Sequence, residues 1–194
     1  MRYAMIGWGS LVWDLDDLAP KVRGVWARGA GPVLPLEFSR VSKKRHGALT
    51  AALDTEYGQP ARTSVIEAAA RSLEEATADL AARERAPIGL IGAVCTIRGA
   101  AHGAKAPVVE HIAAWCAQTG WTGAVWTDLP ANFHEATGAP FSVARGEAYL
   151  RALSEPSLAE AHRYITRAPP ETDTALRRRL SADPWWQALG KRLG

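Results

Sequence analysis

Residues 3–14, YAMIGWGSLVWD, begin as a short apolar stretch and break at Gly7-Trp8-Gly9-Ser10. An apolar run that stops at glycines predicts a buried strand followed by a tight turn. Glycines let the backbone approach a ligand closely, and consecutive amides in such a turn can hold a carboxylate. A turn that needs glycine only for its backbone dihedrals explains the same residues, so this stretch alone leaves both interpretations open.

The composition bounds the class of protein. The 194 residues are 47% apolar and 22% charged, which suits one soluble globular domain spanning 1–194, with a helical extension from about residue 142. A net charge of +3 is too small to imply nucleic acid, and we interpret the basic runs 42–46 and 176–180 as solvated surface. The sequence contains neither a stretch of about 20 apolar residues nor a secretory pattern. We therefore predict a cytoplasmic protein with no membrane or nucleic-acid partner.

The sequence offers little for a metal or an organic cofactor. Cys95 and Cys116 lie in apolar surroundings, which favours two buried thiols in reduced form. No two histidines have the i, i+4 spacing of a helical metal site, and no serine or cysteine stands in a nucleophile elbow. The turn GWGSLV lacks the third glycine of a dinucleotide-binding fingerprint. We predict no metal and no cofactor.

Hydrophobic periodicity and capping signals outline the remaining elements. Ser72 and Glu75 have the spacing of a capping box, and Leu73, Ala76 and Leu80 form one apolar face of the helix that follows. The strands are expected at 36–42, 47–54, 63–71, 88–97 and 122–130, with a hairpin around 43–47 and a glycine-rich loop at 98–106. Further helices are expected from Pro107 to Gly120, and over 141–153 and 157–168 with Ser142 and Ser157 as caps, followed by a basic tail.

Glu84 is the carboxylate that the pattern singles out. It ends the capped helix, where the partial negative charge of the carbonyls disfavours a carboxylate. Partial burial there would raise its pKa, which suits a general base. A solvated helix end, flanked by Arg83 and Arg85, explains the same residues without any chemistry.

The segment VWTDLPANF, residues 125–133, ends a predicted strand in polar residues. Such a strand end often forms the rim of a site, because loops on a rigid scaffold carry function. An Asx turn, with Asp128 capping the following backbone, is the alternative.

Three segments together resemble the γ-glutamylcyclotransferase-like family. YAMIGWGSLVWD is similar to the family's glycine-serine loop, PLEFSRVSKKRHGALTAALD to its arginine- and threonine-bearing strands, and LEEATADLAARERA to its helix ending in glutamate. Trp8 stands where the family has tyrosine or phenylalanine, and Arg85 where it has glycine.

The resemblance implies an α+β fold, a small mixed β-barrel flanked by helices, and a cofactor-independent enzyme. Such enzymes release 5-oxoproline from γ-glutamyl compounds by intramolecular attack, with one glutamate as acid/base. It implies that Glu84 is catalytic and that the substrate is bound by Gly7, Trp8, Gly9, Ser10 and Leu11, with Arg40 as a second anion contact. A non-catalytic module that binds a small carboxylate on the same barrel is the alternative. A third hypothesis is single-stranded nucleic-acid binding through the basic runs and tryptophans.

Overall fold

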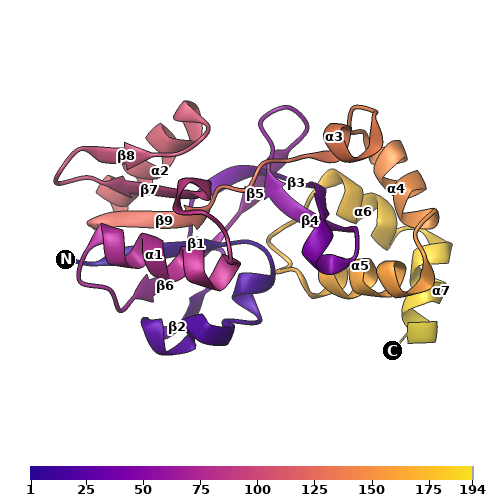
Figure 1. Cartoon of the computed structure of the whole chain (residues 1–194), viewed down its shortest axis with the longest axis horizontal. Coiled ribbons are helices and arrows are strands. Elements are labelled where there is room, and N and C mark those ends of the chain that lie inside the picture. Colours follow the sequence, from indigo (N-terminus) through magenta and orange to yellow (C-terminus); the bar gives the residue numbers. More distant parts are fainter. Residues whose placement is uncertain (194) are drawn as a thin grey trace. The chain divides into compact units, whose positions relative to one another are not determined.

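The computed structural model describes residues 1–193, which divide into two compact units (Figure 1). Unit 1 comprises Met1–Val33 and Arg62–Leu129, and unit 2 comprises Leu34–Ala61 and the chain from Pro130 onward. Both units contain strands and helices, so the α+β class is confirmed. That the whole chain behaves as a single domain remains a prediction.

Unit 1 is built on a six-stranded mixed sheet with the order β2-β6-β1-β9-β7-β8. Central strand β1 runs parallel to β9 and antiparallel to β6. The strands are β1 (Tyr3–Gly7), β2 (Val22–Ala27), β6 (Ser64–Ala68), β7 (Ile91–Cys95), β8 (Ala100–His102) and β9 (Gly123–Thr127). The short 3-10 helices are η1 (Ser10–Val12), η2 (Asp16–Lys21) and η4 (Ile88–Leu90).

The closed barrel that the resemblance implies is not what the described residues form. Closure of the first sheet would require β2 to pair with β8, and these two strands are its opposite edges. The strands β3 (Val33–Ser42), β4 (Ala48–Leu53) and β5 (Gln59–Arg62) form a second sheet of their own, in the order β4-β3-β5. β3 pairs with β4 on one side and β5 on the other, so it belongs to this second sheet and does not extend the first one.

Helices cover both faces of the sheet in unit 1. α1 (Leu73–Glu84) packs with Met5, Ile66 and Val125 on one face. Successive residues of a strand face opposite sides, so Trp126 faces away from α1, towards α2 (Ala106–Thr119), which contacts β7 and β9. This arrangement buries the centre of the sheet on both sides.

The Ser72 cap and the two buried cysteines of unit 1 are as predicted, and the second bond of the capping box is not. Ser72 accepts a hydrogen bond from the Glu75 amide, although Glu75 reaches back to the amide of Arg71 rather than to that of the cap residue. Cys95 and Cys116 are buried and unpaired, and burial raises the pKa of Cys116 to about 12. The interior of unit 1 therefore holds two thiols, and burial keeps that of Cys116 protonated.

One predicted loop in unit 1 is a hairpin instead. Within 98–106, residues Ala100–His102 form β8 and pair with β7. Gly99 at φ 62° supplies the left-handed turn that reverses the chain. All three residues of β8 are exposed, so the strand has no apolar alternation by which its sequence could have identified it.

Unit 2 combines the three-stranded sheet with the C-terminal helices. The hairpin between β3 and β4 closes through η3 (Lys43–Arg45), as predicted, with His46 and Gly47 at positive φ. The helices are α3 (Phe133–Thr137), α4 (Val143–Arg151), α5 (Glu155–Arg167), α6 (Ala175–Ser181) and α7 (Pro184–Leu193). α5 packs on β4, so the predicted helical extension covers the small sheet of its own unit.

Of the two predicted caps in unit 2, one is confirmed and one is wrong. Ser142 accepts from the Arg145 amide and caps α4. α5 begins at Glu155, two residues before Ser157, with Ser154 as its N-cap residue. Pro156 is the physical reason, because proline suits the first turn of a helix, where its missing N–H is not needed.

Candidate functional site

The loop after β1 is a single tight turn. η1 closes with hydrogen bonds from the Val12 amide to the Gly9 carbonyl (3.0 Å) and from the Trp13 amide to the Ser10 carbonyl (3.1 Å). The amides that open such a turn have no acceptor within it. Trp8 and Leu11 are both buried, at 5% and 4% exposure, and Leu11 anchors the turn to the core of unit 1.

The glycine at position 7 has a packing role. A Cβ on Gly7 would lie 2.8 Å from Cη2 of Trp26 and 3.1 Å from a methyl of Val12. Gly7 is not at positive φ, and Gly9 has φ −128°. The turn therefore does not need these glycines for left-handed dihedrals, and Gly7 is required by the close approach of an indole ring.

Glu84 lies at the same end of the sheet as this loop. β6 runs antiparallel to β1 and leads into α1, so α1 returns alongside β1 and ends where β1 ends. The guanidinium of Arg83 donates to the carbonyls of Leu15 (2.8 Å) and Asp14 (2.6 Å), just beyond the loop. Glu84 is the last residue of α1 and is half-buried. The bonds of its neighbour Arg83 therefore tie the helix end that carries Glu84 to the segment after η1.

Arg85 closes α1 in a left-handed conformation, with φ 50° and ψ 45°. This backbone region suits glycine, which the family that the sequence resembles has at the position of Arg85. The backbone geometry therefore follows the resemblance although the residue type does not.

Two polar side chains that sequence reasoning missed lie beside Gly7. Ser64 pairs with Gly7 across β6 and β1, is fully buried, and its hydroxyl has no hydrogen-bond partner among the described residues. The indole N–H of Trp26, whose ring packs against Gly7, is also buried without a partner. Natural proteins leave few such groups unpaired, and each one calls for a specific explanation. The one sequence signal for this position is a polar residue, Ser64, inside the largely apolar predicted strand 63–71.

Arg40 belongs to unit 2 and is therefore described with that unit. It lies on β3, and its guanidinium donates to the carbonyl of Pro130 (2.6 Å). Next to it, the Asn132 amide bonds both the N–H and the carbonyl of Val41. The PANF part of 125–133 thus bonds to β3, the central strand of the small sheet.

Asp128, in the same predicted segment, makes a hydrogen bond that joins two loops of unit 1. Its carboxylate accepts from the Ala104 amide (2.5 Å), in the loop after β8, rather than capping the backbone that follows it. The Asx-turn interpretation is therefore wrong about the hydrogen-bond donor. β9 ends beside the loop after β8, and this places Asp128 within reach of the Ala104 amide.

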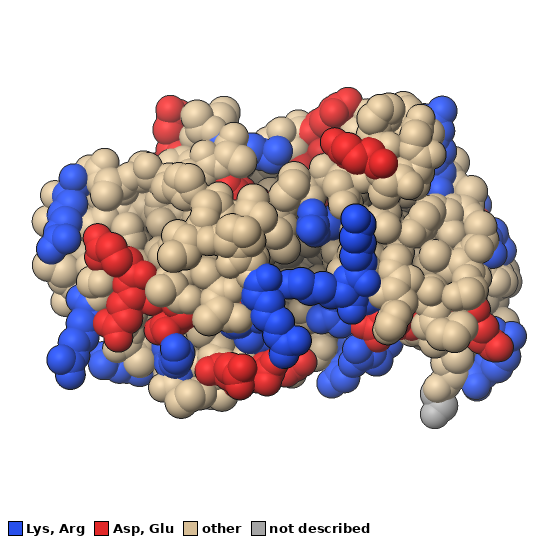
Figure 2. All heavy atoms as spheres, in the orientation of Figure 1, with Lys and Arg blue, Asp and Glu red and all other residues tan. Residues whose placement is uncertain are grey.

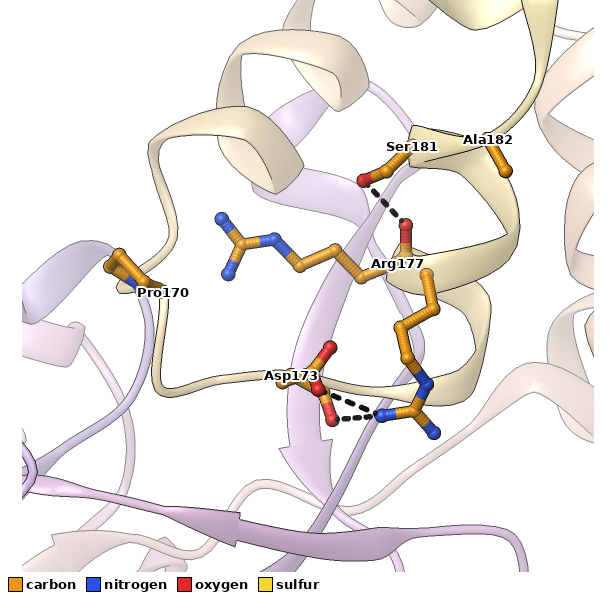
Figure 3. Close-up of a pocket in the computed structure, with 6 residues that line it drawn as sticks. Pro170, Asp173, Arg177, Ser181 and Ala182 are labelled. Atoms are coloured by element: carbon orange, nitrogen blue, oxygen red, sulfur yellow. Dashed lines mark hydrogen bonds and ion pairs between the residues drawn. The ribbon is translucent and has the colours of Figure 1, made fainter.

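A pocket of about 440 Å³ lies in unit 2, away from every predicted site residue in sequence. Figure 3 shows Arg177, Asp173 and Ser181 around it. Arg177 donates to the carbonyls of Ala168 and Thr172, and Arg178 pairs with Asp173 at 3.0 Å. Burial lowers the pKa of Arg177. The basic groups of this pocket already have partners, so it is not the candidate site.

The basic runs show the same pairing. Arg45 pairs with Glu160, and Arg179 with Glu147. Figure 2 shows basic and acidic side chains on the same face of the molecule. That the chain has no nucleic-acid partner stays a prediction. Leu176 and Leu180 are fully buried, so the interpretation of the run 176–180 as solvated surface is wrong for these two residues.

Among residues 1–193, no cluster of three or more His, Cys, Asp or Glu side chains could hold a metal ion. No helix in the same range is long and apolar enough to cross a membrane. Comparison with family models, with curated proteins and with solved structures finds no match for this chain. The candidate site therefore rests on geometry: the loop 7–11, the end of α1 with Glu84, and the pair Ser64 and Trp26.

Proposed function

We propose that the chain is a γ-glutamylcyclotransferase-like enzyme that releases 5-oxoproline from a γ-glutamyl amino acid, peptide or amine. One observation carries the proposal. The glycine-serine loop and the glutamate-bearing end of α1 lie at one end of the unit 1 sheet, and Arg83 bonds that helix end to the residues after the loop. The resemblance requires this proximity between two segments some 70 residues apart in the chain.

In the proposed reaction, the substrate supplies its own nucleophile. The Glu84 carboxylate takes a proton from the α-ammonium group, and the neutral amine attacks the γ-carbonyl carbon. A C–N bond forms within the glutamyl group, and the γ-amide C–N bond breaks as Glu84 returns the proton to the departing nitrogen. The second proton that the attacking nitrogen loses on becoming the lactam N–H passes through Glu84 to the released amine. Positioning lowers most of the barrier to an intramolecular attack, so one carboxylate and a rigid cradle suffice.

The loop would supply that cradle. In the proposal, the amides of Gly9, Ser10 and Leu11 hold the substrate α-carboxylate, and the buried Trp8 ring limits the size of the bound group. Arg40 as a second anion contact remains a prediction from the resemblance. The two buried, unpaired cysteines agree with action in the reducing cytoplasm.

The test is release of 5-oxoproline from glutathione and a panel of γ-glutamyl dipeptides and amines. We expect at least one substrate to turn over. Glu84→Gln should lower kcat by about 100-fold or more, since a positioned acid/base contributes at least that much. Absence of turnover with the whole panel would contradict the proposal.

Glu74→Gln is the matched control. Glu74 is an exposed carboxylate in the first turn of the same helix, 73% exposed, and lies at the opposite end from Glu84. We expect its kcat to equal that of the wild type. If Glu84→Gln is as active as Glu74→Gln, the assigned mechanism is wrong. If substrate binds to the wild type and is recovered unchanged, the chain is a carboxylate-binding module.

A further inference from the structure

The side chains of Ser64 and Trp26 lie near Gly7, on the same face of the unit 1 sheet. β6 lies between β2 and β1, yet the six-membered ring of Trp26, on β2, reaches Gly7 on β1. The indole must therefore cross β6 at the level of the residue that opposes Gly7, and that residue is Ser64. Directly opposed residues of an antiparallel pair point to the same face. The ring consequently lies on the same face of the sheet as the Ser64 side chain.

Both groups are left without partners at this position. The Ser64 hydroxyl and the Trp26 indole N–H are fully buried and unpaired in the described chain. An unmade hydrogen bond in the interior disfavours folding, and strain of this kind tends to persist where it serves function. The position immediately precedes the loop 8–11 and shares the α1 face with Met5 and Ile66.

We infer that Ser64 and Trp26 form a substrate subsite that donates hydrogen bonds to an oxygen of the bound glutamyl group. An indole N–H only donates, and a hydroxyl can do so, so together they suit a carbonyl or carboxylate oxygen. Binding brings the acceptor that the free chain lacks. This inference rests on the proposed function and adds two substrate-binding residues to it.

Trp126 provides an internal control. Its indole N–H is also buried and unpaired, in the same unit, but it faces away from α1 and packs directly on Gly92. Trp26→Phe and Trp126→Phe each remove one buried, unpaired N–H and keep an aromatic ring. Only the first removes a group of the subsite.

The experiment measures kcat and KM for 5-oxoproline release, the affinity for 5-oxoproline by calorimetry, and Tm, in Ser64→Ala, Trp26→Phe and Trp126→Phe. We expect Ser64→Ala and Trp26→Phe to lower kcat/KM roughly tenfold or more. Ser64→Ala should keep or raise Tm, because it removes an unpaired polar group. Trp126→Phe should keep wild-type kcat/KM. A fall mainly in kcat identifies the γ-carbonyl oxygen, and a rise mainly in KM the carboxylate.

The remaining outcomes contradict the subsite, the proposed enzyme activity or both. If the wild type turns over and Ser64→Ala and Trp26→Phe stay within twofold of it, the subsite is wrong and the proposed function stands. If Trp126→Phe loses as much activity as Trp26→Phe, the effect is one of packing and the subsite is again wrong. If the wild type binds without turnover, the enzyme proposal fails and the affinities of the same variants decide the subsite. If it neither binds nor reacts, both proposals fail.

Discussion

In unit 2 the fully buried carboxylate of Glu37 accepts hydrogen bonds from the amides of Phe38 (2.8 Å) and Leu176 (3.3 Å), whereas in unit 1 the equally buried hydroxyl of Ser64 has no partner. Nearby in unit 2, Ser39 donates to the buried Asp54 (2.6 Å). Among the residues of unit 2 up to 193, the exception is one carboxylate oxygen of the half-buried Glu171. Paired buried polar groups specify a fold, and unpaired ones beside a loop and a helix end are candidates for ligand contacts.

The largest expected effect is on the stability of unit 2. Glu37→Ala should lower the free energy of unfolding by about 3 kcal/mol, because it leaves a cavity and removes the hydrogen-bond acceptor of the amides at the start of α6. Urea unfolding followed by circular dichroism measures this, with hydrogen exchange of α6 locating the loss. A loss below about 1 kcal/mol would show that the buried network does not hold α6.

The next effect tests the packing at the candidate site. Gly7→Ala places a methyl 2.8 Å from the Trp26 ring and should cost about 2 kcal/mol. Gly89→Ala is the control in the same unit, since a Cβ at Gly89 meets nothing within 4 Å. Combining Gly7→Ala with Trp26→Phe should restore part of the stability, and strict additivity of the two changes would contradict the contact.

A smaller effect is expected at the end of α1. Arg85→Gly should raise the free energy of unfolding by about 1 kcal/mol, because glycine adopts the left-handed conformation at low cost. Arg85→Ala retains the unfavourable Cβ and should not stabilise the chain. Thermal unfolding of the two variants side by side distinguishes them, and equal Tm values would contradict the backbone explanation.

The smallest expected effect is a difference in pH dependence. Burial raises the pKa of Glu37 above its ordinary 4.5, so the folded state keeps this proton to higher pH than the unfolded state does. Its contribution to stability is therefore greatest below pH 4.5 and falls as the pH rises through the raised value. Glu37→Gln should lack this fall. Urea midpoints of both chains from pH 4 to 8 measure it, and parallel curves would contradict the assignment.

Local signals predicted much of unit 1. The apolar run of β1, the glycines after it and the Ser72 cap of α1 are all encoded within a few residues, and the structure has them where expected. The open sheet could not be predicted in this way, because closure depends on which edge strands meet. Ser64 and Trp26 were missed for the same reason, since the strand order β2-β6-β1 alone brings them together.

The contrast between the candidate site in unit 1 and the paired buried groups of unit 2 has one direct test. The ¹⁵N-labelled chain is titrated with 5-oxoproline, and the amide signals are followed by NMR. The account predicts saturable shifts for the amides of Gly9, Ser10 and Leu11, while those of Phe38 and Leu176, already held by Glu37, stay in place. Shifts at Phe38 and Leu176 without any at the loop, or no shift at all, would contradict it.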